Sequence, residues 1–157
     1  MAAGTWKIYT QAKRLLGAGS ITLGAGIFRM TLHSVGASAN ILKVSDGGIS
    51  TYASIGSEIN ASGGYVTGGR TIGPATGKWT VGASTKQMKF TYTTTGLVFT
   101  ASGANLASIK YAALRNSTGA GAGKVLCFVT LSTSPFTITS GNTLTISPSA
   151  SGVFTLA

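Results

Sequence analysis

Residues 109–131, IKYAALRNSTGAGAGKVLCFVTL, decide the fold: two short apolar runs flank a loop with three alternating glycines. The run Lys124–Ser132 is β-branched and aromatic, and it is too short and too closely bounded by glycine to favour a helix. It is apolar on both faces, as expected for a strand in the middle of a sheet. Because Ile109–Arg115 also has the pattern of a strand, the stretch predicts a β-hairpin with a flexible glycine-rich connection.

The loop of this hairpin partly matches the phosphate-binding loop of nucleotide-binding proteins. That motif requires Gly, four residues and then Gly-Lys-Ser/Thr, because backbone amides surround the phosphates and the hydroxyl ligates magnesium. Counted back from Gly123-Lys124, Thr118 replaces the first glycine, and Val125 replaces the hydroxyl residue. No helix is predicted after the loop either, so we expect no nucleotide to bind there.

Further strands follow from the alternation of apolar and polar residues. In the stretch 27–33, Phe28, Met30 and Leu32 fall on one face, and Arg29 and Thr31 fall on the other. We expect residues 86–92 and 97–100 to pair as a hairpin, and residues 49–55 fit either a helical turn or a strand. The other predicted strands are 41–44, 78–82, 136–139, 144–146 and 153–156.

One helix is predicted, at residues 5–16, with Thr5 as its N-cap and Gly17 as its stop. At least seven short strands separated by glycine-rich turns follow it. The pattern predicts an all-β fold, a β-sandwich or a jelly-roll-like arrangement, in a single domain over residues 1–157.

The charge of the chain is low in amount and one-sided. Only 9% of the 157 residues are charged, against about 25% in an average soluble domain. Mean hydropathy is +0.34, which leaves little polar surface for a free monomer, so we expect an oligomer and specifically a trimer.

Twelve Lys and Arg oppose only Asp46 and Glu58, which gives the chain a net charge of +10. This balance favours an acidic protein surface, nucleic acid or anionic lipid as partner. The candidate partner contacts are Lys7, Lys13, Arg14, Arg29 and His33.

The chain has few residues that could perform chemistry: one His, one Asp, one Glu and one Cys. A catalytic triad would need His33 with Asp46 or Glu58 and a serine, but no Gly-x-Ser-x-Gly elbow marks a nucleophile. No two metal-ligand residues lie within five positions of each other. We therefore predict no catalytic residue, no cofactor and no metal, with His33 at the surface or an interface and Cys127 in the core.

Nucleic acid and membrane remain as partner classes to weigh. The aromatic residues fall at strand spacings that indicate core positions rather than stacking platforms, so nucleic-acid binding ranks third among our hypotheses. No charged start precedes an apolar stretch, and no run approaches 18 apolar residues, so we expect neither a signal peptide nor a membrane span.

Residues 7–33, KIYTQAKRLLGAGSITLGAGIFRMTLH, resemble the start of a family of small virion proteins of tailed bacteriophages. Those proteins begin with a Tyr-x-x-Ala-Lys helix, a Gly-x-Ile-x-Leu turn and an alternating Phe-Lys/Arg-x-x-Leu strand. The matching positions here are Tyr9, Ala12, Lys13, Gly19, Ile21, Leu23, Phe28, Arg29 and Leu32. The strand at Tyr111–Asn116, the apolar strand at 125–131 and the closing GNTLTISPSASGVFTLA also resemble that family. Where the family carries aspartate in Ile-Asp-Leu, this chain has Thr22.

The resemblance implies a non-enzymatic structural subunit of the phage particle, made in the host cytoplasm and located in the virion. Members are capsid decoration (cement) proteins or minor tail or fibre components. The implied partners are the major capsid protein lattice and copies of the chain itself, or alternatively tail proteins.

Overall fold

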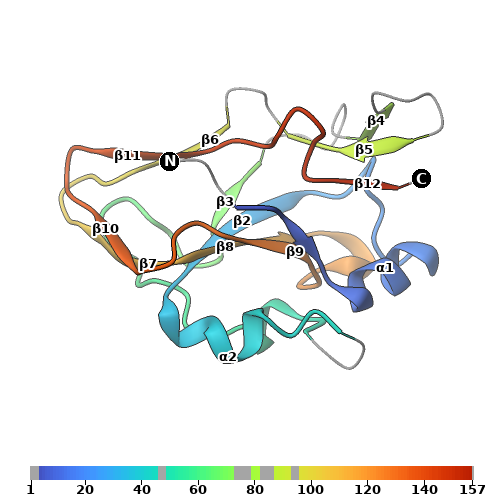
Figure 1. The fold of residues 1–157 in the computed structure, drawn as a ribbon, viewed down its shortest axis with the longest axis horizontal. Helices are drawn as coiled ribbons and strands as arrows, with labels where there is room; N and C mark the ends of the chain where they lie inside the picture. Colours follow the sequence, from blue (N-terminus) through green and yellow to red (C-terminus); the bar gives the residue numbers. More distant parts are fainter. Residues whose placement is uncertain (1–3, 46–48, 73–78, 82–86, 93–95, 157) are drawn as a thin grey trace.

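The computed structural model describes residues 4–45, 49–72, 79–81, 87–92 and 96–156. The predicted all-β class is confirmed, because short antiparallel strands make up most of the regular structure (Figure 1). The strands are β1 Lys7–Ile8, β2 Phe28–His33, β3 Arg70–Thr71, β4 Trp79–Val81, β5 Met88–Phe90, β6 Leu97–Thr100, β7 Leu106–Ile109, β8 Tyr111–Asn116, β9 Val125–Thr130, β10 Phe136–Ile138, β11 Thr143–Ile146 and β12 Phe154–Leu156. The helices are α1 Thr10–Gly17 and α2 Ser38–Ile41, with 3-10 turns η1 Val35–Ala37, η2 Tyr52–Ser54 and η3 Gly119–Gly121.

A five-stranded antiparallel sheet in the order β1-β9-β8-β2-β3 forms the centre of the molecule. The predicted hairpin is confirmed: β8 and β9 pair across the glycine loop, and Tyr111 lies opposite Thr130. The register shifts between Leu114 and Arg115. Strand β9 is interior, as its continuous apolar run predicts, and its residues from Val125 to Val129 are all buried.

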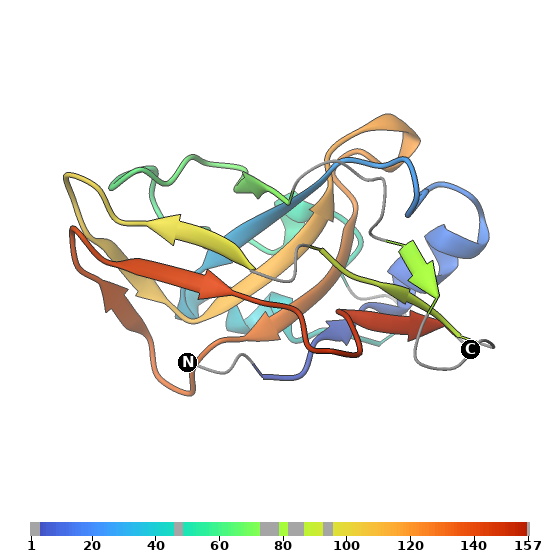
Figure 2. The ribbon, with the colours of Figure 1, turned by 90° about the horizontal axis from the view of Figure 1, so that it is seen from above.

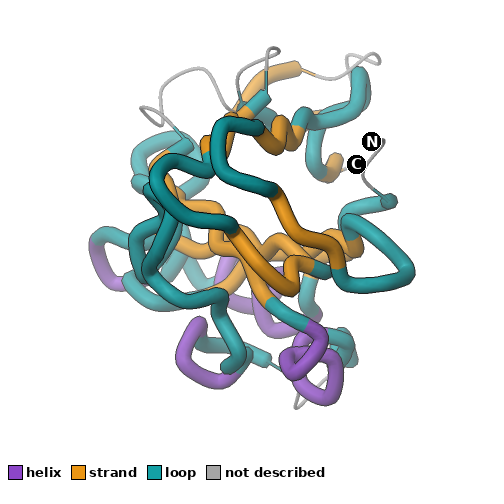
Figure 3. The backbone as a smooth tube through the Cα atoms, turned by 90° about the vertical axis from the view of Figure 1, so that its left-hand side faces the viewer, coloured by secondary structure: helices purple, strands orange, loops and turns teal. Residues whose placement is uncertain are grey.

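Both faces of this central sheet are covered. One face carries Phe28, Met30 and Leu32 of β2 in a large apolar cluster shared with the second layer of strands. The other face packs against the helices through a second cluster that includes Tyr9, Ala12, Ala37, Ile41, Ile55, Tyr111, Ala113 and Phe128. Figures 1 and 3 show the helices gathered on one side of the strands. The face of β2 predicted to be polar is therefore also buried, and Thr31 is fully enclosed.

The second layer consists of small sheets, which makes the fold a β-sandwich-like arrangement of two layers. Their strand orders are β12-β5-β4, β11-β6 and β10-β7. Figures 1 and 2 show β4, β5, β6, β11 and β12 on the side of the central sheet away from the helices. In Figure 1, β7 and β10 lie at the left-hand end, where β7 leads directly into β8. The segment that contains β6 and β7 runs antiparallel to the segment that contains β10 and β11. Strand β6 pairs with β11, and β7 pairs with β10.

Three local predictions are wrong. The helix begins at Thr10 rather than Thr5, because Lys7 and Ile8 pair with β9 instead. Residues 38–41 form the short helix α2, and the predicted strand at 41–44 is absent, with Ile41 buried and Leu42 48% exposed. Strands β5 and β6 do not form a hairpin with each other: β5 pairs with β4 and β12, and β6 pairs with β11. The open choice at 49–55 resolves into the turn η2.

Candidate functional site

The structure separates the five predicted partner contacts into three settings. Lys7 on β1 and Lys13 and Arg14 on α1 are exposed, and these two elements follow each other at the β1 edge of the central sheet (Figure 1). Arg29 on β2 is half-buried, and His33, also on β2, is completely buried. The three N-terminal cations are thus open to a partner, Arg29 is only partly so, and His33 belongs to the interior of the molecule.

The expected surface position of His33 is wrong, because residues 51–58 and the helix side cover that face of β2. Its Nδ1 lies 2.9 Å from the carbonyl oxygen of Gly56, which only accepts, so Nδ1 carries a hydrogen. Its Nε2 lies 2.8 Å from the Thr31 hydroxyl, which can donate to it. Burial lowers the pKa of His33 from 6.5 to about 4. The ring is therefore neutral at pH 7, with both nitrogens engaged by the protein. It borders a small cavity of about 180 Å³.

Two neighbouring arginines fasten a loop to the central sheet. Arg29 and Arg115 lie opposite each other on β2 and β8. Arg29 donates from Nε and Nη2 to the carbonyl oxygen of Gly69, at 3.1 and 2.7 Å. Arg115 makes the same forked contact with Gly68, at 3.3 and 2.9 Å. A Cβ at Gly69 (φ +79°) would collide with the carbonyl oxygen of Met30, so only glycine allows this approach. Burial and the Arg29 charge lower the pKa of Arg115.

Among the residues that the structure describes, Glu58 is the single acidic one, and its carboxylate is bound by groups of the protein. The hydroxyls of Tyr52 and Tyr65 donate to its two oxygens, and the backbone N–H of Gly68 donates to Oε1 at 2.8 Å. The Tyr65 hydroxyl in turn accepts from Leu32 N–H at 3.0 Å. The guanidinium of Arg115 lies 4.5 Å from the centre of the Tyr52 ring. Burial and the Glu58 contact raise the pKa of Tyr65 above its usual range.

This arrangement has an electrostatic consequence for the surface. The Glu58 carboxylate is held by three donors and is half-buried. Exposed cations such as Lys7, Lys13 and Lys43 therefore have no acidic side chain beside them among the described residues. Asp46, Lys78 and Lys86, which also enter the charge count, lie outside the described residues. The surface that the structure describes is cationic and uncompensated.

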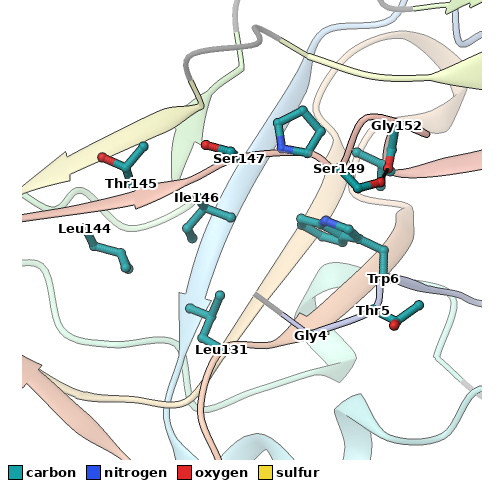
Figure 4. A pocket seen from close by; sticks show the side chains of 12 residues that line it. Gly4, Thr5, Trp6, Leu131, Leu144, Thr145, Ile146, Ser147, Ser149 and Gly152 are labelled. Atoms are coloured by element: carbon teal, nitrogen blue, oxygen red, sulfur yellow. Dashed lines mark hydrogen bonds between the residues drawn. The ribbon is translucent and has the colours of Figure 1, made fainter. Parts of the chain in front are cut away.

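Two cavities open between the layers of the sandwich. The first, about 400 Å³, lies where the N-terminal segment passes the end of β11. Figure 4 shows the Trp6 indole lying across it, with Leu131 and Ile146 on one side and Ser147 and Ser149 above. Its lining holds hydroxyls and apolar groups but no charged side chain.

The second cavity, about 430 Å³, lies on the opposite side of the sandwich between β3 and β6. Its lining combines two arginines with apolar side chains and small residues: Arg29, Gly64, Tyr65, Val66, Gly69, Arg70, Thr71, Phe99, Thr100 and Leu106. Arg70 also donates to the carbonyl oxygen of Val98, which links the two strands. Of these two cavities, the second is the one lined by charged side chains, and both of them are arginines.

Two other sequence features have structural positions. The glycine loop folds into η3, and Gly121 packs closely against Asn116 and Ser20. Cys127 is fully buried in β9, as predicted, and burial raises the pKa of its thiol. No group of three or more His, Cys, Asp or Glu side chains comes together within the described ranges. The described helices are eight and four residues long, too short to cross a membrane.

Sequence reasoning missed the role of Tyr52, Tyr65, Gly68 and Arg115 around Glu58. These residues are separated by up to 63 positions in the chain, and only folding brings them together. The available signal is the scarcity of acids: an isolated glutamate in a strongly basic chain needs donors, and tyrosines and glycines follow it closely. Comparison of the chain with protein-family models, with curated protein sequences and with solved structures finds no match.

Proposed function

We propose that the chain is a non-enzymatic structural subunit of a tailed-phage particle, a capsid decoration (cement) protein that binds the lattice of the major capsid protein. The observation that carries the proposal is the uncompensated cationic surface. Lys7, Lys13 and Arg14 are exposed at one edge, and Glu58 is turned inward onto three donors. Such a surface is suited to an acidic partner that is presented many times, as on a shell.

The remaining surface supports a role in assembly. Charge is scarce, and four large apolar side chains are 42–65% exposed, namely Ile27, Val35, Leu42 and Val66. Positive charge speeds encounter and sets orientation, and buried apolar contacts then supply lasting affinity. We propose that copies of the chain also bind one another as a trimer, and that the protein is made in the host cytoplasm and resides in the virion.

A minor tail or fibre subunit is the second candidate, since the resemblance of residues 7–33 to phage virion proteins includes both locations. Nucleic-acid binding ranks third. Stacking on bases needs exposed aromatic rings, but eight of the eleven Phe and Tyr side chains are buried, and the other three are half-buried. The cations could still contact phosphates, so nucleic acid is retained as an arm of the experiments below.

Fractionation of virions separates the first two candidates. Antibody detection in purified heads and tails, with the copy number measured against the major capsid protein, should place the chain in heads at a number proportional to the lattice. Recovery with tails at a few copies per particle would support the tail role instead. Light scattering on the purified protein tests the trimer, and a stable 15.8 kDa monomer would contradict it.

A further inference from the structure

The second cavity lies between two strand edges that pair with no other strand among the described residues. β3 is the last strand of the central sheet, and β6 pairs only with β11 in the described chain. Ile72 N–H donates to Phe28 O, so the alternation of an antiparallel ladder turns the N–H and C=O of Thr71 away from β2. Ala101 N–H donates to Asn142 O, which likewise turns Val98 and Thr100 away from β11, although the Val98 carbonyl oxygen already accepts from Arg70. Outward backbone groups thus border the cavity from both sides.

The side chains around this groove select the chemistry of a ligand. Arg29 and Arg70 contribute two positive charges, and no acidic side chain lines the cavity. Arg29 uses Nε and Nη2 for Gly69 O, and its Nη1 takes no part in these bonds. Phe99 and Leu106 form an apolar floor, and Val66 is 65% exposed at the rim. The groove combines carboxylate-binding cations, an apolar wall and strand-pairing groups.

We propose that this groove binds an extended segment of the partner protein in which acidic and apolar side chains alternate. The segment pairs with the outward backbone groups of Thr71 or Thr100, places a carboxylate on Arg70, and covers Val66 with an apolar residue. The period of two in a strand puts its two kinds of side chain on opposite faces, so that carboxylates and apolar side chains can meet different parts of the lining.

The occupant is a different protein rather than a second copy of this chain. The chain has only two acidic residues, and Glu58 is bound internally by Tyr52, Tyr65 and Gly68. A partner with an acidic surface supplies what the chain lacks. Identifying that partner as the major capsid protein rests on the proposed function; the recognition of an acidic extended segment rests on the groove alone.

The first experiment tests the groove independently of any capsid. The probe is a hexapeptide of alternating valine and glutamate, titrated into isotope-labelled protein and followed by backbone amide NMR, with a valine–lysine hexapeptide and N-acetylglutamate as controls. We expect shift changes concentrated at Thr71, Val98 and Thr100 with the acidic peptide only. Changes spread over the exposed lysines, or equal affinity for N-acetylglutamate, would overturn the proposal, since either result means general anion binding.

Matched charge reversals locate the binding. Arg70→Glu should weaken peptide binding by about tenfold or more, because it places like charges face to face. Lys43→Glu makes the same charge change at an exposed residue just after α2, outside the lining of the groove, and should have an effect of less than about twofold. Val66→Asp changes the rim of the groove, and Val35→Asp is its matched control in the peptide titration. Val35 lies on η1 and is 48% exposed. Equal losses within each pair would overturn the proposal, as would an Arg70→Glu protein whose only change is its oligomeric state.

The second experiment adds the capsid. Wild type, Arg70→Glu and Lys43→Glu are offered to emptied, expanded shells of the phage that encodes the chain. We expect Arg70→Glu to lose retention and Lys43→Glu to keep most of it. If wild type binds shells and both variants bind as well as wild type, the groove proposal fails and the proposed function stands. If wild type does not bind shells, the proposed function fails, and the peptide titration still decides the groove.

Discussion

The central sheet and the second layer of strands are built from the same short β-segments, but they are packed differently. In β2, β8 and β9 nearly every residue is buried, because the second layer covers one face of the sheet and the helices cover the other. In β6, β10 and β11 burial alternates with exposure, and threonines occupy many of the outward positions. The central sheet is therefore the stable scaffold, and the second layer and the sheet edges supply solvent-facing surface for binding.

The largest difference should appear when one aromatic side chain is removed from each region. Phe128 on β9 is fully buried and packs 5.4 Å from the ring of Tyr9, so Phe128→Ala should cost about 3–5 kcal/mol of unfolding free energy. Phe136 on β10 is half-buried, and Phe136→Ala should cost less than half as much. Urea denaturation followed by circular dichroism measures both. Equal losses would contradict the division into scaffold and surface layer.

The buried face of β2 should make the protein sensitive to acid. His33 has a pKa of about 4 when folded and 6.5 when exposed, so the unfolded chain binds a proton that the native protein does not. Stability should be full above pH 6.5 and fall by about 3 kcal/mol as the pH drops to 4. Because the chain has only two acidic side chains, few other groups titrate in this window.

The control for this pH dependence is His33→Asn, which keeps a donor for Gly56 O but does not titrate. Its stability at pH 7 should be lower than that of wild type, and the slope between pH 6.5 and 4 should largely disappear. An unchanged slope in this variant would show that another group causes the acid sensitivity.

The Glu58 carboxylate should contribute less to the free energy of unfolding than the His33 effect described above. Glu58→Gln replaces a charged acceptor of three hydrogen bonds with an amide that can accept at only one atom, so we expect a loss of about 2 kcal/mol at pH 7. Tyr52→Phe removes one of those bonds and should cost about 1 kcal/mol. A Glu58→Gln protein as stable as wild type would show that the network does not hold the loop at Gly68.

Exposed cations should have the smallest effect on stability. Lys13→Ala and Arg14→Ala should change unfolding free energy by no more than about 0.5 kcal/mol. Arg29→Ala should cost more, because its two bonds to Gly69 O are lost. At low salt, the two surface variants should nevertheless attach to capsid shells several-fold more slowly in stopped-flow mixing. Unchanged attachment rates would remove these residues from the partner surface.

Local features of the fold were predictable, and long-range pairing was not. The β8–β9 hairpin follows from two adjacent runs and the glycines between them, and the interior position of β9 follows from its apolar run. The partners of β5 come from β4 and from the end of the chain, so a hairpin with the next strand was the wrong inference. At residues 41–44 the apolar run is too short for its period to distinguish strand from helix.

The candidate site was predicted less well, because its character depends on what covers each face. Alternation in β2 correctly placed Arg29 and Thr31 on the face opposite the large apolar cluster, and the structure shows that His33 shares this face with Thr31. The sequence does not show that residues 51–58 and the helices lie over that face, which makes His33 a buried, neutral residue. The groove at Arg29 and Arg70 was also unpredicted, since it forms between strands that are separated in the chain by residues 72–96.

The central claim is that the uncompensated positive charge serves attachment to an acidic protein shell, and one salt titration tests it most directly. Labelled protein is offered to DNA-free, expanded shells and to naked duplex DNA across about 50–200 mM salt, and retention is measured after washing. On our account, added salt slows attachment to shells but does not strip bound protein, because buried apolar contacts hold it. Failure to bind empty shells, together with tight binding to DNA that falls by orders of magnitude over the same range, would contradict the claim.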